Sequence, residues 1–136
     1  MNIDPKGPMN LITMDVGNTN IKFGLWVGKS MIHTWRSVTR LKTSGDELGL
    51  VLEGFLRLNG LKFNDVADLV VVSVVPPMRP AIERMGNRYL NRSPIFVQSH
   101  TQTIMPVLYE NPSELGSDRV VGAVAAYRRV KGPLIV

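Results

Sequence analysis

The apolar residues of this chain change their spacing near residue 40, and this change constrains the fold more than any other feature. Before it, apolar and polar residues alternate, as in a strand that buries one face. The clearest alternating set is Ile21, Phe23, Leu25 and Val27. After it, apolar residues recur at helical spacing from Leu48 to Leu56. We therefore predict an antiparallel meander of strands at residues 10–15, 20–27 and 30–38, followed by a helix over 45–59.

The remainder of the chain alternates between helix and strand. Ser44 and Glu47 have the spacing of a capping box at the start of the first helix. Residues 68–75, DLVVVSVV, are apolar nearly throughout, which is typical of a buried central strand. A second helix with Met78, Ile82, Met85 and Tyr89 inward, a short strand at PIFV, and a helix over 118–131 follow. This order predicts an α/β domain of three layers on a mixed sheet, with the antiparallel meander first and parallel strands with helices after it.

Composition limits the classes of function. The chain has 136 residues, which is enough for one domain with a core, and its formal net charge is +5. This charge allows an anionic partner, but on charge alone a solvated surface is the favoured interpretation. No apolar run is long enough for a membrane helix, and the first residues lack the apolar centre of a signal peptide. We expect a cytoplasmic protein. Cysteine is absent, so disulfides and thiol chemistry are excluded.

The stretch DVGNTNIK, from Asp15 to Lys22, lies between the first two predicted strands. Gly17 lets a ligand approach the backbone, and the amides of a tight turn can cradle phosphate oxygens. Thr19 can add a hydroxyl contact, Lys22 a neutralising charge, and Asp15 a partner for a metal or water. The same composition also suits a plain hairpin turn, in which Asp15 and Asn18 bond their own backbone. Spacing alone leaves both interpretations open.

A second polar cluster, GSDR, begins the last predicted helix. Asp118 is favoured near a helix N-terminus by the macrodipole and by capping, and Arg119 can be a plain surface cation. The functional alternative makes Asp118 a general base and Arg119 an anion clamp.

Three stretches together resemble type III pantothenate kinases. They are DVGNTNIKFG near the start, VVVSVVPP in the middle and YENPSELGSDRVVGAVAAY near the end, in order between Met9 and Val136. The family has the acetate kinase, sugar kinase, Hsp70 and actin fold. The resemblance therefore implies a ribonuclease H-like (actin-like ATPase) domain. It also implies ATP-dependent phosphorylation of pantothenate, the first step towards coenzyme A.

The resemblance also assigns roles to residues of this chain. The ATP phosphates and the metal are assigned to the first loop, which consists of Asp15, Val16, Gly17, Asn18, Thr19, Asn20, Ile21 and Lys22. Pantothenate is assigned to Tyr109, Gly116, Ser117, Asp118 and Arg119. Asp118 becomes the catalytic base and Asp15 the partner of magnesium. The resemblance implies ATP, magnesium and a monovalent cation (potassium or ammonium) as cofactors. It also implies that the protein is a homodimer.

The chain departs from the family pattern where it stops, at GPLIV. Family members continue into a second half that opens with a strand and another Asp-x-Gly-Thr loop. We therefore expect the amino-terminal half of such a protein, inactive alone and without the monovalent-cation ligand. Its expected parts are a leader at 1–8, the actin-like domain at 9–132, and the first strand of a second domain at 133–136.

Two other functions remain open. One is phosphoryl transfer on the same fold to a different acceptor. The other is a non-enzymatic transcriptional accessory factor of the same family. The net charge permits nucleic-acid contact, yet the sequence has no helix-turn-helix, zinc-finger or aromatic-interleaved basic motif. We do not expect nucleic acid or membrane among its partners.

Overall fold

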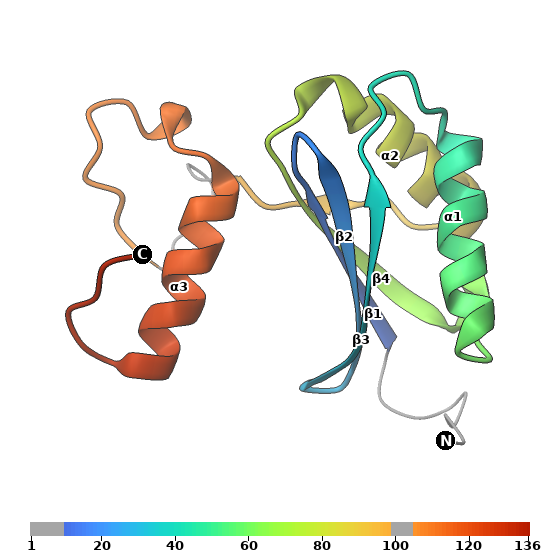
Figure 1. Ribbon diagram of the computed structural model, residues 1–136, viewed down its shortest axis with the longest axis horizontal. Helices are drawn as coiled ribbons and strands as arrows, with labels where there is room; N and C mark the ends of the chain where they lie inside the picture. Colours follow the sequence, from blue (N-terminus) through green and yellow to red (C-terminus); the bar gives the residue numbers. More distant parts are fainter. Residues whose placement is uncertain (1–9, 99–104) are drawn as a thin grey trace.

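A mixed β-sheet forms the centre of the molecule (Figure 1). The computed structural model describes residues 10–98 and 105–136. Within these residues the sheet has five strands in the order β3-β2-β1-β4-β5. They are β1 (Asn10–Val16), β2 (Asn20–Val27), β3 (Ser30–Val38), β4 (Val66–Ser73) and β5 (Ile95–Phe96). The first three pair antiparallel, and β4 and β5 add parallel pairs. The predicted fold class, with its antiparallel meander first, is confirmed.

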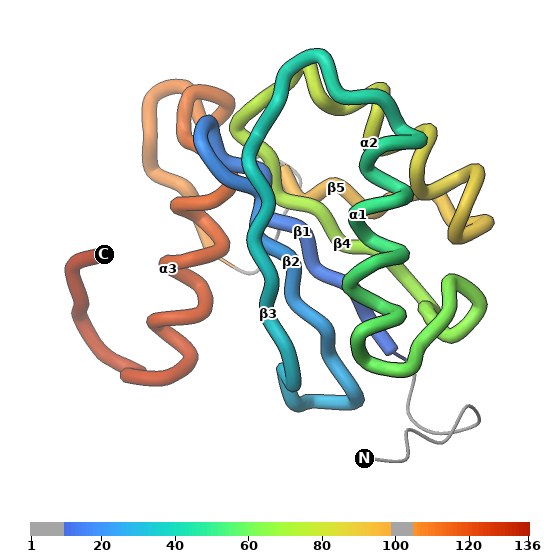
Figure 2. Tube along the Cα trace, turned by 45° about the vertical axis from the view of Figure 1, so that its right-hand side comes forward, coloured from blue at the N-terminus to red at the C-terminus, as the bar shows by residue number. Residues whose placement is uncertain are grey.

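Helices cover both faces of the sheet and complete three layers. They are α1 (Gly45–Leu58), α2 (Arg79–Met85) and α3 (Ser117–Val130). In Figure 1, α1 and α2 lie on one side of the sheet and α3 on the other, and Figure 2 shows the same separation after a turn of the view. We call the side of α1 and α2 the core face and the side of α3 the groove face. Among the described residues, no helix has the length and apolar character needed to cross a membrane.

The core face is sealed by apolar side chains. Alternate residues of β1, β2 and β4 point into it and are almost completely buried, as period-two strands require. This set is Ile12, Met14, Val16, Ile21, Phe23, Leu25, Leu69 and Val71. From α1, Phe55 packs edge-on against Phe23 and stacks on Trp35 of β3, with ring centroids 5.2 Å apart in the stacked pair. These contacts hold α1 against the meander.

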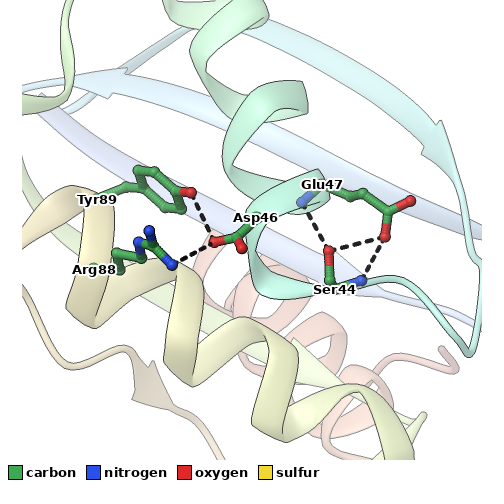
Figure 3. Close-up of polar contacts among 5 residues, drawn as sticks. All are labelled: Ser44, Asp46, Glu47, Arg88 and Tyr89. Atoms are coloured by element: carbon green, nitrogen blue, oxygen red, sulfur yellow. Dashed lines mark hydrogen bonds and ion pairs between the residues drawn. The ribbon is translucent and has the colours of Figure 1, made fainter.

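Polar contacts fix the N-terminal end of α1 (Figure 3). The predicted capping box is present: the Glu47 backbone N–H donates to Ser44 Oγ at 3.1 Å, and the Ser44 N–H donates to Glu47 Oε2 at 2.7 Å. One residue before Glu47, the Asp46 carboxylate accepts a hydrogen bond from the Tyr89 hydroxyl at 2.7 Å and pairs with Arg88 at 3.3 Å. The hydrogen bond to Asp46 raises the pKa of Tyr89. These contacts join α1 to the segment after α2.

Two predicted elements differ in the structure. The central strand ends at Ser73, two residues earlier than predicted, because the Ser73 hydroxyl accepts a hydrogen bond from the Val75 N–H. The second helix changes to a π-helical turn at Gly86–Leu90. Residues 133–136 have no regular secondary structure here, and Ile135 and Val136 are exposed, so their place as the first strand of a second domain stays a prediction. The predicted leader at 1–8 lies outside the described residues.

Candidate active site

The turn between β1 and β2 is held from the side by the end of β3. The Gly17 N–H donates to the Asn20 carbonyl at 3.0 Å and closes the turn. Thr39, just after β3, donates its hydroxyl to the Gly17 carbonyl at 2.6 Å and its N–H to the Thr19 carbonyl at 2.9 Å. In the described parts of the chain, neither Asp15 nor Asn18 uses its side chain to bond this backbone. The self-capped hairpin considered from the sequence is therefore not the arrangement found.

Asp15 and Lys22 lie directly opposite each other on β1 and β2. The Lys22 ammonium is 3.5 Å from the Asp15 carboxylate, and about half of each side chain is exposed. Both residues belong to the groove face, since their neighbours Met14 and Phe23 are buried on the core face. The site thus has one carboxylate and one cation next to an exposed turn.

The start of α3 reaches the same edge of the sheet. The Ser117 hydroxyl donates to the carbonyl of Ser73, the last residue of β4, at 3.4 Å. Gly116 is the N-cap and makes no side-chain cap, and Asp118 Oδ1 accepts from the Arg119 N–H at 2.9 Å. A Cβ on Gly116 would lie 2.5 Å from Asp118 Oδ1, so any other residue there would require the Asp118 carboxylate to shift. Asp118 contributes to the first turn without being its N-cap.

A groove lies between α3 and the sheet, and we call it the α3 groove. It has a volume of about 510 Å³. Asp15, Lys22 and Asp118 line it from three different elements. The rest of its lining is mostly apolar and includes Trp26, Met31, Val70, Val72 and Val121. The fold therefore brings two carboxylates and one ammonium, distant in sequence, into one open space.

The other predicted site residues lie in different positions. Val16 and Ile21 are buried on the core face, so only their backbone is available to a ligand. Asn18 and Thr19 are exposed in the turn, and Gly17 and Asn20 are partly exposed beside them. Arg119 is exposed at the start of α3 and does not line the α3 groove. Tyr109 is also exposed and lies outside the groove lining.

Sequence reasoning missed Trp26 and Thr13 as groove residues. The Trp26 indole N–H donates to Thr13 Oγ1 at 3.1 Å, across the position of Gly24. The signal was present in the alternation of Lys22, Gly24 and Trp26 along one face of β2.

The donor set suits magnesium better than a transition metal. No group of three His, Cys, Asp or Glu residues that could hold a metal occurs within the described ranges. Magnesium, however, commonly binds through one or two carboxylates together with substrate phosphates and water. Asp15, which lines the groove, provides such a carboxylate.

By sequence, the family model and the relatives that match this chain all point to the same family. Residues 11–136 match the family model described as type III pantothenate kinase. The type III pantothenate kinase of Syntrophotalea carbinolica is 46% identical over 126 residues, which are 93% of this chain and 49% of the relative. That of Syntrophobacter fumaroxidans is 41% identical over 117 residues, 86% of this chain and 45% of the relative. The chain thus spans about half the length of the curated relatives it matches.

Similarity to solved structures is weaker. A Pseudomonas aeruginosa protein similar to peptidase YEAZ has a TM-score of 0.48 and 14% identity, covering 65% of this chain and 42% of that one. The AlfA filament bound to AMPPNP has a TM-score of 0.47 and 16% identity, covering 89% of this chain and 39% of that one. At these scores and identities, neither similarity bears on function.

Proposed function

This chain belongs to the type III pantothenate kinase family, and we propose that the protein containing it transfers the γ-phosphoryl group of ATP to pantothenate. The convergence of Asp15, Lys22 and Asp118 in the α3 groove is the observation that carries this proposal. Phosphoryl transfer needs positive charge at the phosphates and a base beside the attacking hydroxyl. Two separate segments supply these groups.

In the proposed reaction, the β1–β2 turn and Lys22 bind the ATP phosphates. The backbone amides of the exposed turn orient the phosphate oxygens, and the Lys22 ammonium neutralises their charge. In the structure the Asp15 carboxylate pairs with the Lys22 ammonium. We assign Asp15 to the magnesium ion, so that in the bound state Lys22 is left to pair with the phosphates. Bound magnesium would further neutralise the phosphate oxygens.

Asp118 is the proposed general base. It would accept the proton of the primary hydroxyl of pantothenate as that oxygen attacks the γ-phosphorus. Gly116 keeps the carboxylate free of a side-chain clash, and the Arg119 amide holds one of its oxygens. The other oxygen is then available to the hydroxyl. Tyr109, Ser117 and Arg119 stay predicted contacts of pantothenate.

Four further features belong to the same proposal. We assign the protein to the cytoplasm, and we assign no residue of this chain to the monovalent cation. A homodimer is supported by two exposed apolar side chains of α3 that lie outside the α3 groove, Tyr127 and Val130. Because the chain spans about half of its curated relatives, we also propose that it does not turn over substrate alone.

The test is acceptor-dependent phosphoryl transfer by the full encoded protein. We expect label from γ-labelled ATP to appear on pantothenate, and ADP formation to require pantothenate. Acetate, glycerol and pantoate, offered in parallel, should be poor acceptors. Preferred phosphorylation of one of these would assign a different acceptor, and no transfer to any of them would contradict the kinase proposal. The 136-residue chain assayed alone checks the proposed need for further residues.

A further inference from the structure

Three charged residues form a row across the meander, next to the β1–β2 turn. The strand register places Asp15 opposite Lys22, and Lys22 opposite Arg36 of β3. Arg36 belongs to the groove face, because Thr34 lines the α3 groove, whereas Trp35 between them stacks on Phe55 on the core face. The Arg36 side chain is exposed.

The charges in this row do not balance. Asp15 forms an ion pair with Lys22, and among the described residues no carboxylate forms an ion pair with Arg36. Like charges directly opposite on neighbouring strands destabilise a sheet. Lys22 and Arg36 are such a pair. A bound anion between or above them would remove this cost.

The row is also held in place beside the turn. Thr39, three residues after Arg36, makes two hydrogen bonds to the turn backbone at Gly17 and Thr19. The stacking of Trp35 on Phe55 anchors β3 on the opposite face. The β3 backbone at Arg36 is therefore fixed relative to the turn by contacts on both sides of it in sequence.

We propose that Arg36 is a phosphate-binding residue of this kinase, holding the phosphates that stay with the nucleotide. This inference rests on the proposed function. Neighbouring strands lie roughly 4.8 Å apart, so β3 is about 10 Å from β1. The α3 groove extends from Val70 and Val72 of β4 to Thr34 of β3, and Asp118 lines it from α3. Arg36 lies outside this lining, two residues along β3 from Thr34. The transferred phosphoryl group belongs near Asp118, and the leaving diphosphate extends towards Arg36. A guanidinium suits this role because it binds phosphate oxygens in a bidentate manner.

The experiment compares Arg36→Gln and Arg36→Lys with Arg57→Gln in the full encoded protein. Arg57 is an exposed arginine in the last turn of α1 and serves as the matched control. We expect Arg36→Gln to raise KM for ATP and Kd for inorganic tripolyphosphate by about tenfold, the loss of one charge-assisted contact, with kcat within about twofold. Arg36→Lys should recover part of the affinity, and Arg57→Gln should match the wild type.

A second readout separates binding from a structural role. Without ligand, Arg36→Gln should melt at the wild-type temperature or slightly above it, because a like-charge contact is lost. Its stabilisation by tripolyphosphate should be smaller than that of the wild type. Unchanged KM and tripolyphosphate affinity, or a loss confined to kcat, would overturn the assignment of Arg36. If tripolyphosphate binding depends on Arg36 but pantothenate is not phosphorylated, the inference stands and the proposed function fails.

Discussion

The two faces of the sheet use the same strands for opposite purposes. On the core face, Ile12 and Met14 of β1 are sealed beneath α1 and α2. On the groove face, their neighbours Thr13 and Asp15 line an open space beside α3. β2 shows the same division, with Phe23 buried on one side and Lys22 half exposed on the other.

This difference shows how one short strand can carry both stability and chemistry. Side chains of a strand alternate between faces, so adjacent residues meet different surroundings. Burial of the apolar set stabilises the fold, and the rigid backbone then fixes the polar set. Substitutions on the groove face should therefore change activity with little loss of stability, and substitutions on the core face should do the reverse.

The largest expected effect lies on the groove face. Asp118→Asn removes the basic carboxylate while keeping its size. If Asp118 is the general base, kcat should fall by about 10²–10⁴-fold with little change in thermal melting or ATP affinity. Pantothenate-dependent ADP formation by the full encoded protein measures this effect.

Glu110→Gln is the control for Asp118→Asn, since Glu110 is an exposed carboxylate that does not line the α3 groove. It should retain wild-type turnover. An Asp118→Asn protein that melts and turns over like the wild type would make Asp118 a purely structural residue of the first turn.

A core-face substitution should have the opposite signature. Leu52 of α1 is completely buried, whereas Leu50, two residues earlier, is 68% exposed. Leu52→Ala should lower the free energy of unfolding by about 2–5 kcal/mol through lost burial and a cavity, and Leu50→Ala should change it little. Urea denaturation measures both. Equal losses in the two variants would contradict the assignment of the core face.

Glycine substitutions refine the comparison, because the groove face also contains a packed position. A Cβ on Gly24 would lie 2.6 Å from Thr13 Oγ1 and 3.3 Å from Trp26 Nε1. Gly24→Ala should therefore destabilise the protein by about 1–3 kcal/mol and disturb the bond between Trp26 and Thr13. A Cβ on Gly54, within α1, would meet nothing within 4 Å. Gly54→Ala should instead stabilise the helix, by about 0.5–1 kcal/mol. Thermal melting that ranks the two variants the other way would refute the packing described for Gly24.

The core face could be predicted from the sequence more fully than the groove face. Periodicity locates β2 and α1, and the Ser44–Glu47 spacing predicts the start of α1, because these signals are local. The α3 groove depends on the packing of α3 against β4, which is distant from it in sequence. The sequence also could not predict which face of the sheet carries Arg36. The β2–β3 register shifts between Leu25 and Trp26, and this shift reverses the alternation of side chains along β3. Motif resemblance found Asp15, Lys22 and Asp118, but no local pattern shows that they share a space.

The smallest expected effect concerns the polar N-terminal end of α1, one of the two helices that cover the core face. Hydrogen bonds from the Ser44 backbone N–H and hydroxyl lower the pKa of Glu47. A carboxyl whose folded pKa is depressed adds stability above its unfolded pKa. This contribution is lost as the pH falls from the usual glutamate range through the lower folded value. Because Glu47 is fully solvated, screening by water keeps the contribution small.

Glu47→Gln tests whether this end of α1 supports stability alone. Glutamine can still accept the Ser44 N–H at this position of a capping box, but it does not titrate. The wild type should be slightly more stable than the variant at neutral pH, and the difference should shrink as the pH falls through the acidic range. Glu53→Gln, an exposed carboxylate on the same helix, controls for the loss of one negative charge. Denaturation at several pH values measures the difference, and pantothenate phosphorylation at neutral pH should not change. A stability difference that is constant with pH would mean that the charge of Glu47 does not contribute. A loss of turnover would mean that the two faces of the sheet are less independent than their packing indicates.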